Sequence, residues 1–203
     1  MKVLLINGSP NKEGNTYLAL KTCADEIEKN GVETEIFHIG SGPIQGCVAC
    51  YACRRGEGCV LQDDVLPALV EKVKEADGLI VGSPTYFAGP NGSLCALLDR
   101  MFFSAGEYLT HKPGAAVAVC RRGGASATLD RLNKYFTIKQ MPLVSSRYWN
   151  LAHGSKAGEV LQDAEGMQTM RNLGLNMAHM VKSLAAKEWP DLGEAPQMTN
   201  FIR

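Results

Sequence analysis

The sequence has no excess of either charge, because 21 Lys and Arg residues are balanced by 21 Asp and Glu residues. Binding to nucleic acid or to an anionic membrane surface needs clustered positive charge, which this balance does not supply. Long apolar runs are also absent, since the longest, at residues 3–6 and 115–120, are far below the ~20 residues that span a bilayer. We therefore expect no nucleic-acid partner and no membrane partner.

There is little room for a targeting segment at the start of the sequence. Met1 and Lys2 lead directly into the apolar residues 3–6 and then into the turn that begins at Asn7, without a charged leader, a longer apolar stretch and a cleavage site. We therefore expect a cytoplasmic protein. In that reducing compartment the seven cysteines are expected to be thiols, and an odd number cannot pair completely.

Short runs rich in β-branched residues alternate with stretches of helical spacing, such as Leu66, Leu69, Val70 and Val73. The expected strands lie at residues 2–6, 32–38, 78–83, 115–120 and 142–149. This alternation predicts βαβ units, and therefore a three-layer α/β fold with a five-stranded parallel sheet and helices on both faces. We expect one domain at residues 1–187, with a cysteine-rich loop at 40–63, followed by an irregular tail at 188–203.

The loop after the first expected strand is rich in groups that bind anions. It runs from Gly8 to Thr16 and offers backbone N–H groups, two hydroxyls and the Asn15 amide at the start of an expected helix. It contains neither a G-x-G-x-x-G motif nor the Gly-Lys-Ser/Thr ending of triphosphate loops. The loop therefore predicts a monophosphate site, and the alternative is a polar turn in which Ser or Thr caps the helix.

The next two loops at the same edge of the sheet have complementary chemistry. The loop after the third expected strand offers the aromatic rings of Tyr86 and Phe87, and the loop after the fourth offers the bare backbone of Gly123 and Gly124. A flavin ring system needs flat apolar faces and nearby backbone donors, which these loops provide together. Taken singly, aromatic residues such as Tyr86 and Phe87 are more often core or rim aromatics than flavin contacts.

Together, the segments 8–16, 83–87 and 97–100 resemble the flavodoxin-fold family of NADPH-dependent FMN reductases, over roughly residues 1–150. The resemblance implies FMN and the strand order 2-1-3-4-5. It assigns the FMN phosphate to Ser9, Asn11, Asn15 and Thr16, the flavin ring to Pro84, Thr85, Tyr86 and Phe87, and its pyrimidine end to Gly123 and Gly124. Asp99 and Arg100 are expected to make structural contacts.

Two arginines depart from the small residues that we expect at the pyrimidine edge of the flavin. Arg121 or Arg122 at the N1 and O2 edge of the flavin would favour the anionic hydroquinone. The alternatives are that both arginines are solvated or paired with surface carboxylates, or that one of them contacts the 2′-phosphate of NADPH. We assign Arg121 to the cofactor site.

Four cysteines fall within thirteen residues, separated by two, two and five residues. They are Cys47, Cys50, Cys53 and Cys59. The two short spacings resemble the consecutive ligands of a bacterial 4Fe–4S site, whereas zinc sites more often use two C-x2-C pairs with a longer spacer. Zinc or no metal remain alternatives. The motif also resembles that of the iron–sulfur flavoproteins, which implies a 4Fe–4S cluster and a homodimer or homotetramer.

These features predict an FMN-dependent oxidoreductase that passes electrons between the cluster, FMN and a redox partner. The resemblance implies ferredoxin or NAD(P)H as donor and a small acceptor such as a quinone or an oxygen species. No catalytic side chain is required, because the flavin carries the redox chemistry. The alternatives are an NAD(P)H-dependent FMN or quinone reductase without a cluster, and a non-enzymatic zinc- or phosphate-ligand-binding module.

Overall fold

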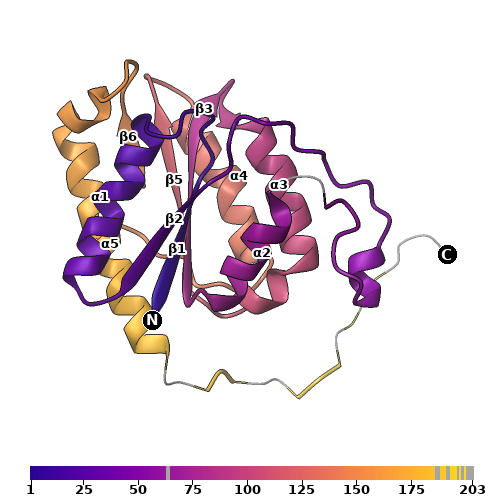
Figure 1. Cartoon of the computed structure of the whole chain (residues 1–203). Helices are drawn as coiled ribbons and strands as arrows, with labels where there is room; N and C mark the ends of the chain where they lie inside the picture. The colour runs from indigo at the N-terminus through magenta and orange to yellow at the C-terminus, as the bar shows by residue number, and fades with distance from the viewer. Residues whose placement is uncertain (63–64, 186–187, 191–192, 196, 198, 200–203) are drawn as a thin grey trace.

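The protein is built around a parallel β-sheet that runs through its centre (Figure 1). The computed structural model describes residues 1–62, 65–185, 188–190, 193–195, 197 and 199. The parallel strands, in spatial order, are β2 (Glu33–His38), β1 (Lys2–Asn7), β3 (Gly78–Tyr86), β5 (Gly114–Cys120) and β6 (Leu151–His153). This confirms the predicted α/β class and the predicted order of five parallel strands. A sixth strand, β4 (Gly89–Pro90), was not predicted and pairs antiparallel with the end of β3.

Helices cover both faces of the sheet. In Figure 1, α1 (Asn15–Lys29) and α5 (Ala164–Leu184) lie on one side of it, and α2 (Leu66–Glu75), α3 (Gly92–Ser104) and α4 (Ala125–Thr137) lie on the other. The described part of the chain also contains the short 3-10 helices η1 (Ala52–Arg55), η2 (Gly106–Leu109) and η3 (Glu159–Gln162). The predicted three-layer arrangement is therefore present.

The core consists of two apolar layers separated by the sheet. Along β1, Leu4 and Ile6 pack in the layer with α2, α3 and α4, whereas Val3 and Leu5 pack in the layer with α1 and α5. This division follows from the alternation of side chains along a strand. A strand covered by helices on both faces needs apolar residues at every position, which explains the continuous apolar run in β1.

The position of the last parallel strand was predicted wrongly. The expected strand at 142–149 forms no regular strand: an isolated bridge joins Leu143 to Gly114 of β5, and the regular strand follows at β6. The intervening segment is bound by α5 instead, since the Ser146 hydroxyl donates to the Thr169 carbonyl at 2.8 Å. The polar residues 145–147 therefore leave the sheet before the chain returns to it.

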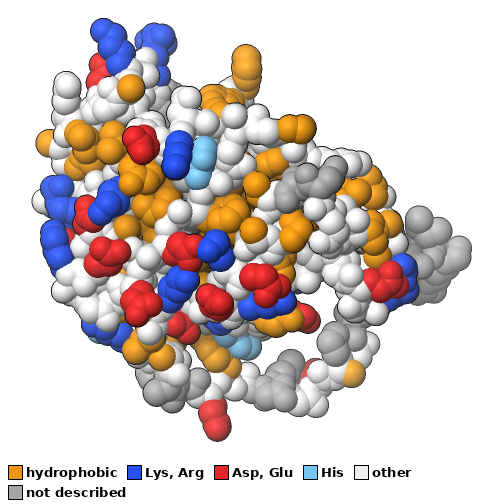
Figure 2. Space-filling model, viewed as in Figure 1, with side chains coloured by type: hydrophobic (Ala, Val, Ile, Leu, Met, Phe, Trp, Pro, Cys, Tyr) orange, Lys and Arg blue, Asp and Glu red, His pale blue; other side chains and the backbone are white. Residues whose placement is uncertain are grey.

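The surface carries both signs of charge. On the face shown in Figure 2, acidic and basic side chains are interspersed, in keeping with the balanced composition. Among the described residues no helix is both long and apolar enough to cross a bilayer.

The predicted irregular tail lies partly outside the described residues. Its described residues belong to no helix or strand, and the Trp189 ring stacks on His111 with centroids 4.4 Å apart.

Candidate functional site

The loop after β1 is organised by a residue that the sequence analysis missed. The buried Asn7 accepts a hydrogen bond from the Ser9 amide at 3.1 Å and donates to the Lys12 carbonyl at 3.1 Å. The Ser9 hydroxyl in turn accepts a hydrogen bond from the backbone N–H of Asn11 at 3.1 Å. The available signal was an asparagine at the end of an otherwise apolar strand.

The start of α1 leaves polar groups available for an anion. Gly14 precedes the helix without a side-chain cap, so the first N–H groups of α1 need another partner. Thr16 is only 2% exposed, and its hydroxyl has no hydrogen-bond partner among the described residues. A phosphate would satisfy both, because a helix N-terminus attracts negative charge.

Asn15 is engaged by a different part of the chain. Its amide donates to the Lys156 carbonyl at 2.9 Å, and its side-chain oxygen accepts from the Val160 amide at 3.4 Å. Asn15 therefore fixes the segment after β6 against the start of α1. The predicted contact of Asn15 with the phosphate stays a prediction.

The aromatic loop after β3 is tied to the phosphate loop by Asn91. Its side chain donates to the Gly8 carbonyl at 2.8 Å, and its backbone amide donates to the buried Ser83 hydroxyl at 3.0 Å. Pro84, Thr85 and Tyr86 therefore lie beside the phosphate loop. Asn91 could have been suspected only as the N-cap of α3, a role that it also has.

The tip of this loop presents aromatic side chains to solvent. Phe87 is fully exposed and adopts a positive φ of 50°, and Tyr86 is 46% exposed. A β-branched or bulky residue pays for a left-handed backbone, so the hairpin formed with β4 must hold Phe87 in this position. The two rings are free to cover a flat ligand.

The loop after β5 packs against the aromatic loop. Gly124 has a φ of 86°, and a Cβ there would lie 2.8 Å from the Ala88 Cα, so only glycine allows this approach. The Thr128 hydroxyl donates to the Thr85 hydroxyl at 3.2 Å. Arg121 and Arg122 are exposed and form no ion pair among the described residues. The structure thus brings the three predicted loops together at the carboxyl ends of β1, β3 and β5.

The four clustered cysteines line one cavity of about 250 Å³ on the side of α3. They are Cys47, Cys50, Cys53 and Cys59. Their segment turns sharply, with positive φ angles at Ala49, Tyr51, Gly56 and Gly58, and contains η1, a helix that the sequence did not predict.

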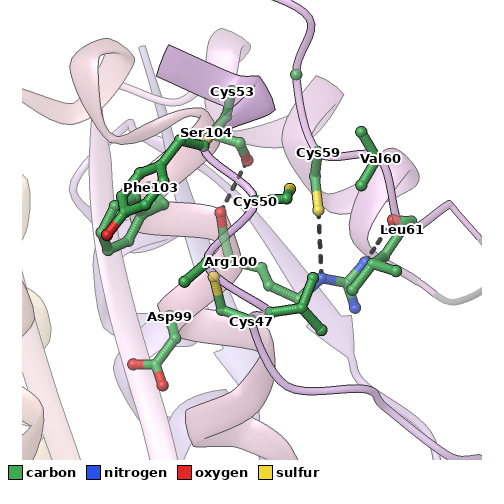
Figure 3. A pocket seen from close by; sticks show the side chains of 14 residues that line it. Cys47, Cys50, Cys53, Cys59, Val60, Leu61, Asp99, Arg100, Phe103 and Ser104 are labelled. Carbon is green, nitrogen blue, oxygen red and sulfur yellow. Dashed lines mark hydrogen bonds between the residues drawn. The ribbon is translucent and has the colours of Figure 1, made fainter.

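Arg100 lines the cysteine cavity from α3 and hydrogen-bonds to both ends of the segment that carries the cysteines (Figure 3). The side chain is 1% exposed; Nε donates to the Cys59 sulfur at 3.4 Å, and the terminal nitrogens donate to the carbonyls of Gln45, at 3.2 Å, and of Leu61. The structural role predicted for Arg100 is therefore to hold the cysteine segment against α3 through these hydrogen bonds.

The donor set fits an iron–sulfur cluster in chemistry, since four free thiols face one largely apolar cavity. Among the described residues, however, no three His, Cys, Asp or Glu side chains lie close enough together to hold a metal ion. The sulfurs therefore share a cavity without converging on one point. The remaining cysteines lie elsewhere, and burial raises the pKa of the Cys23 thiol far above its usual range.

Asp99, beside Arg100 on α3, faces α4. It forms an ion pair with Arg131 at 3.5 Å and accepts a hydrogen bond from the Tyr135 hydroxyl at 2.5 Å. These are structural contacts, as predicted.

Comparison with known proteins agrees with this geometry. Residues 1–156 match the family model of NADPH-dependent FMN reductases. An iron-sulfur flavoprotein of Methanocaldococcus jannaschii is 37% identical over 190 residues, covering 90% of this chain and 98% of the relative. An iron-sulfur flavoprotein of Archaeoglobus fulgidus is 35% identical over 193 residues, covering 92% and 93%.

The fold is also found among solved structures. A flavodoxin from the domain Archaea superposes with a TM-score of 0.61 at 17% identity, covering 90% of this chain and 99% of the other. Its similarity concerns the fold alone. The family match and the two relatives show that this chain belongs to the NADPH-dependent FMN reductase family, in the branch of the iron–sulfur flavoproteins.

Proposed function

We propose that this FMN-family oxidoreductase transfers electrons between a 4Fe–4S cluster, FMN and a redox partner. The observation that carries the proposal is the cavity lined by Cys47, Cys50, Cys53 and Cys59, with the Arg100 guanidinium against it. When bound, FMN exchanges one or two electrons and a 4Fe–4S cluster passes single electrons. The chain's own part is to bind, orient and electrostatically balance these groups.

For the phosphate of FMN, we assign binding to Ser9, Asn11, Thr16 and the first N–H groups of α1, with Asn15 at the rim. The unpartnered Thr16 hydroxyl supports this assignment most directly. An ionised phosphate accepts charge-assisted hydrogen bonds, which are the strong ones.

For the flavin ring, we assign the face to the exposed Tyr86 and Phe87 together with Pro84 and Thr85. The N–H groups of Gly123 and Gly124 are proposed to face the pyrimidine edge, because Gly124 contacts the aromatic loop. Arg121 is exposed and forms no ion pair among the described residues, which leaves its charge available to the reduced flavin or to a nucleotide phosphate.

For the partners, we propose ferredoxin or NAD(P)H as the electron donor and a small molecule such as a quinone or an oxygen species as the acceptor. Membership in the family of NADPH-dependent FMN reductases supports the nucleotide donor. We further propose a cytoplasmic homodimer or homotetramer, with residues 1–187 as one domain.

The second candidate is an NAD(P)H-dependent FMN or quinone reductase whose cysteines hold no cluster. It is favoured by the family match, because the family model that covers residues 1–156 is that of NADPH-dependent FMN reductases. Membership in an oxidoreductase family argues against the third alternative, a non-enzymatic zinc or phosphate-ligand module.

Single serine substitutions test the assignment of the cluster. Cys47→Ser, Cys50→Ser, Cys53→Ser and Cys59→Ser are each expected to lower bound iron and sulfide in anaerobically purified protein while FMN content stays near the wild-type level. The control is Cys95→Ser, because Cys95 lies on α3 outside the cavity. Equal iron and sulfide in all five variants and the wild type would contradict the proposal.

A further inference from the structure

A second cavity lies beside the cysteine cavity, with walls from α3 and α4. Its volume is about 480 Å³, and it shares only Asp99 and Phe103 with the lining of the cysteine cavity. None of the four clustered cysteines and none of the three loops assigned to FMN contributes to it. Cavities of this size commonly hold small organic ligands.

The cavity gathers positive charge in a protein whose overall charge is balanced. Its lining carries four cationic side chains, Arg54, Arg131, Lys134 and Lys139, against the single carboxylate of Asp99. That carboxylate is already engaged, by an ion pair with Arg131 and by the Tyr135 hydroxyl. Among the described residues, Arg54, Lys134 and Lys139 form no ion pair, so their charges are not compensated locally.

The surface between these cations is flat and aromatic. Tyr135 is 7% exposed, and its ring stacks on Phe102, with centroids 5.3 Å apart and planes 23° apart. The Arg131 guanidinium lies 4.4 Å from the Tyr135 centroid, and that of Arg54 lies 5.5 Å from the Phe103 centroid. Phe103 is 50% exposed, so an aromatic face remains open to a ligand.

We infer that this cavity binds a small organic anion that carries a flat aromatic ring. The ring packs against Phe103 and the exposed Ile138, and the anionic group interacts with the uncompensated Lys134 and Lys139. Cations beside aromatic rings favour such a ligand, because the ring gains apolar contact while the anion gains charge pairing. The inference goes beyond the proposed function and does not depend on a cluster in the neighbouring cavity.

The test compares two probes of the same shape and different charge. Calorimetry on the FMN-loaded protein at low ionic strength measures the binding of naphthalene-2-sulfonate and of the uncharged naphthalene-2-methanol. We expect the sulfonate to bind more tightly and to weaken as salt is added, since exposed charges are screened. The double variant Lys134→Gln and Lys139→Gln should weaken sulfonate binding by about tenfold and leave the alcohol unchanged.

The matched control removes two lysines from the opposite face of the sheet. Lys21→Gln with Lys29→Gln alters α1 and lowers the net charge equally, and it should bind the sulfonate like the wild type. Equal affinity of the two probes for the wild type, or unchanged sulfonate binding in the Lys134 and Lys139 variant, would overturn the inference. Inorganic sulfate that displaces the probe at its own concentration would likewise overturn it, by showing that the ring contributes nothing. Iron content measured on the same samples keeps the result separate from the cluster proposal.

Discussion

The substitution Arg100→Met tests how the cysteine segment is held. Methionine keeps a long, unbranched side chain in the buried place on α3, but it removes the charge and every donor. The segment then loses the hydrogen bonds to the Cys59 sulfur and to the carbonyls of Gln45 and Leu61. These bonds join positions on both sides of the cavity, so their loss should release residues 45–61 together.

The magnitude follows from the number of bonds. A typical hydrogen bond contributes about 1 kcal/mol net, and the two carbonyls belong to a surface segment where water can replace the lost donors. The three hydrogen bonds named above therefore correspond together to about 3 kcal/mol of local opening free energy. A change of that size accelerates amide exchange about 100-fold.

Hydrogen exchange of peptides that cover residues 45–61, measured on the FMN-loaded protein, reports this opening. Arg100→Lys keeps the charge but cannot span all three acceptors, so it should give a smaller increase. The control is Arg171→Met, since Arg171 is exposed on α5. Unchanged exchange in Arg100→Met, or an equal increase in Arg171→Met, would refute this role of Arg100.

Three further predictions concern the rest of the site. Thr16→Val should weaken FMN by about 1.5–3 kcal/mol and riboflavin much less in titrations of the apoprotein, because only FMN carries the phosphate; equal losses would remove Thr16 from the phosphate site. Gly124→Ala should destabilise the protein by about 1–3 kcal/mol and weaken the binding of FMN. The control is Gly56→Ala, because Gly56 also has a positive φ, of 84°, but an added Cβ would meet no atom within 4 Å. This control should leave the affinity for FMN unchanged. Asp163 caps α5 and its pKa is lowered, because hydrogen bonds from the Gly166 and His153 amides outweigh the effect of burial. Asp163→Ala should therefore lower the free energy of unfolding by about 1 kcal/mol at pH 7, measured by denaturant unfolding. The difference from the wild type should shrink as the pH falls below the usual aspartate pKa, because the wild-type carboxyl then protonates. A difference that is constant with pH would contradict this prediction.

Local patterns in the sequence were sufficient for the layers and for the position of the candidate FMN site. Continuous apolar strands alternating with amphipathic helices specify a parallel sheet, and the loops at its carboxyl edge meet by topology alone. That reasoning holds for β1, β3 and β5, whose following loops are joined by Asn91 and by the contact at Gly124.

The rest depended on contacts between distant residues. The segment at 142–149 has the composition of a strand, yet α5 captures it through Ser146 and the strand forms later at β6. Arg100 follows an apolar helical stripe, and nothing in the local spacing shows that its guanidinium is buried under the cysteine segment. The side-chain bonds of Asn7 likewise appear only once the loop has closed around it.

The central claim is that one chain carries both FMN and a cluster held by Cys47, Cys50, Cys53 and Cys59. The direct test is the content of iron, acid-labile sulfide and FMN in protein that was purified and reconstituted without oxygen. The account predicts iron, sulfide and FMN in a ratio of about four to four to one, with flavin absorption bands over a broad sulfide-to-iron charge-transfer background. Stoichiometric FMN with iron no higher than in a variant that lacks all four cysteines would contradict it.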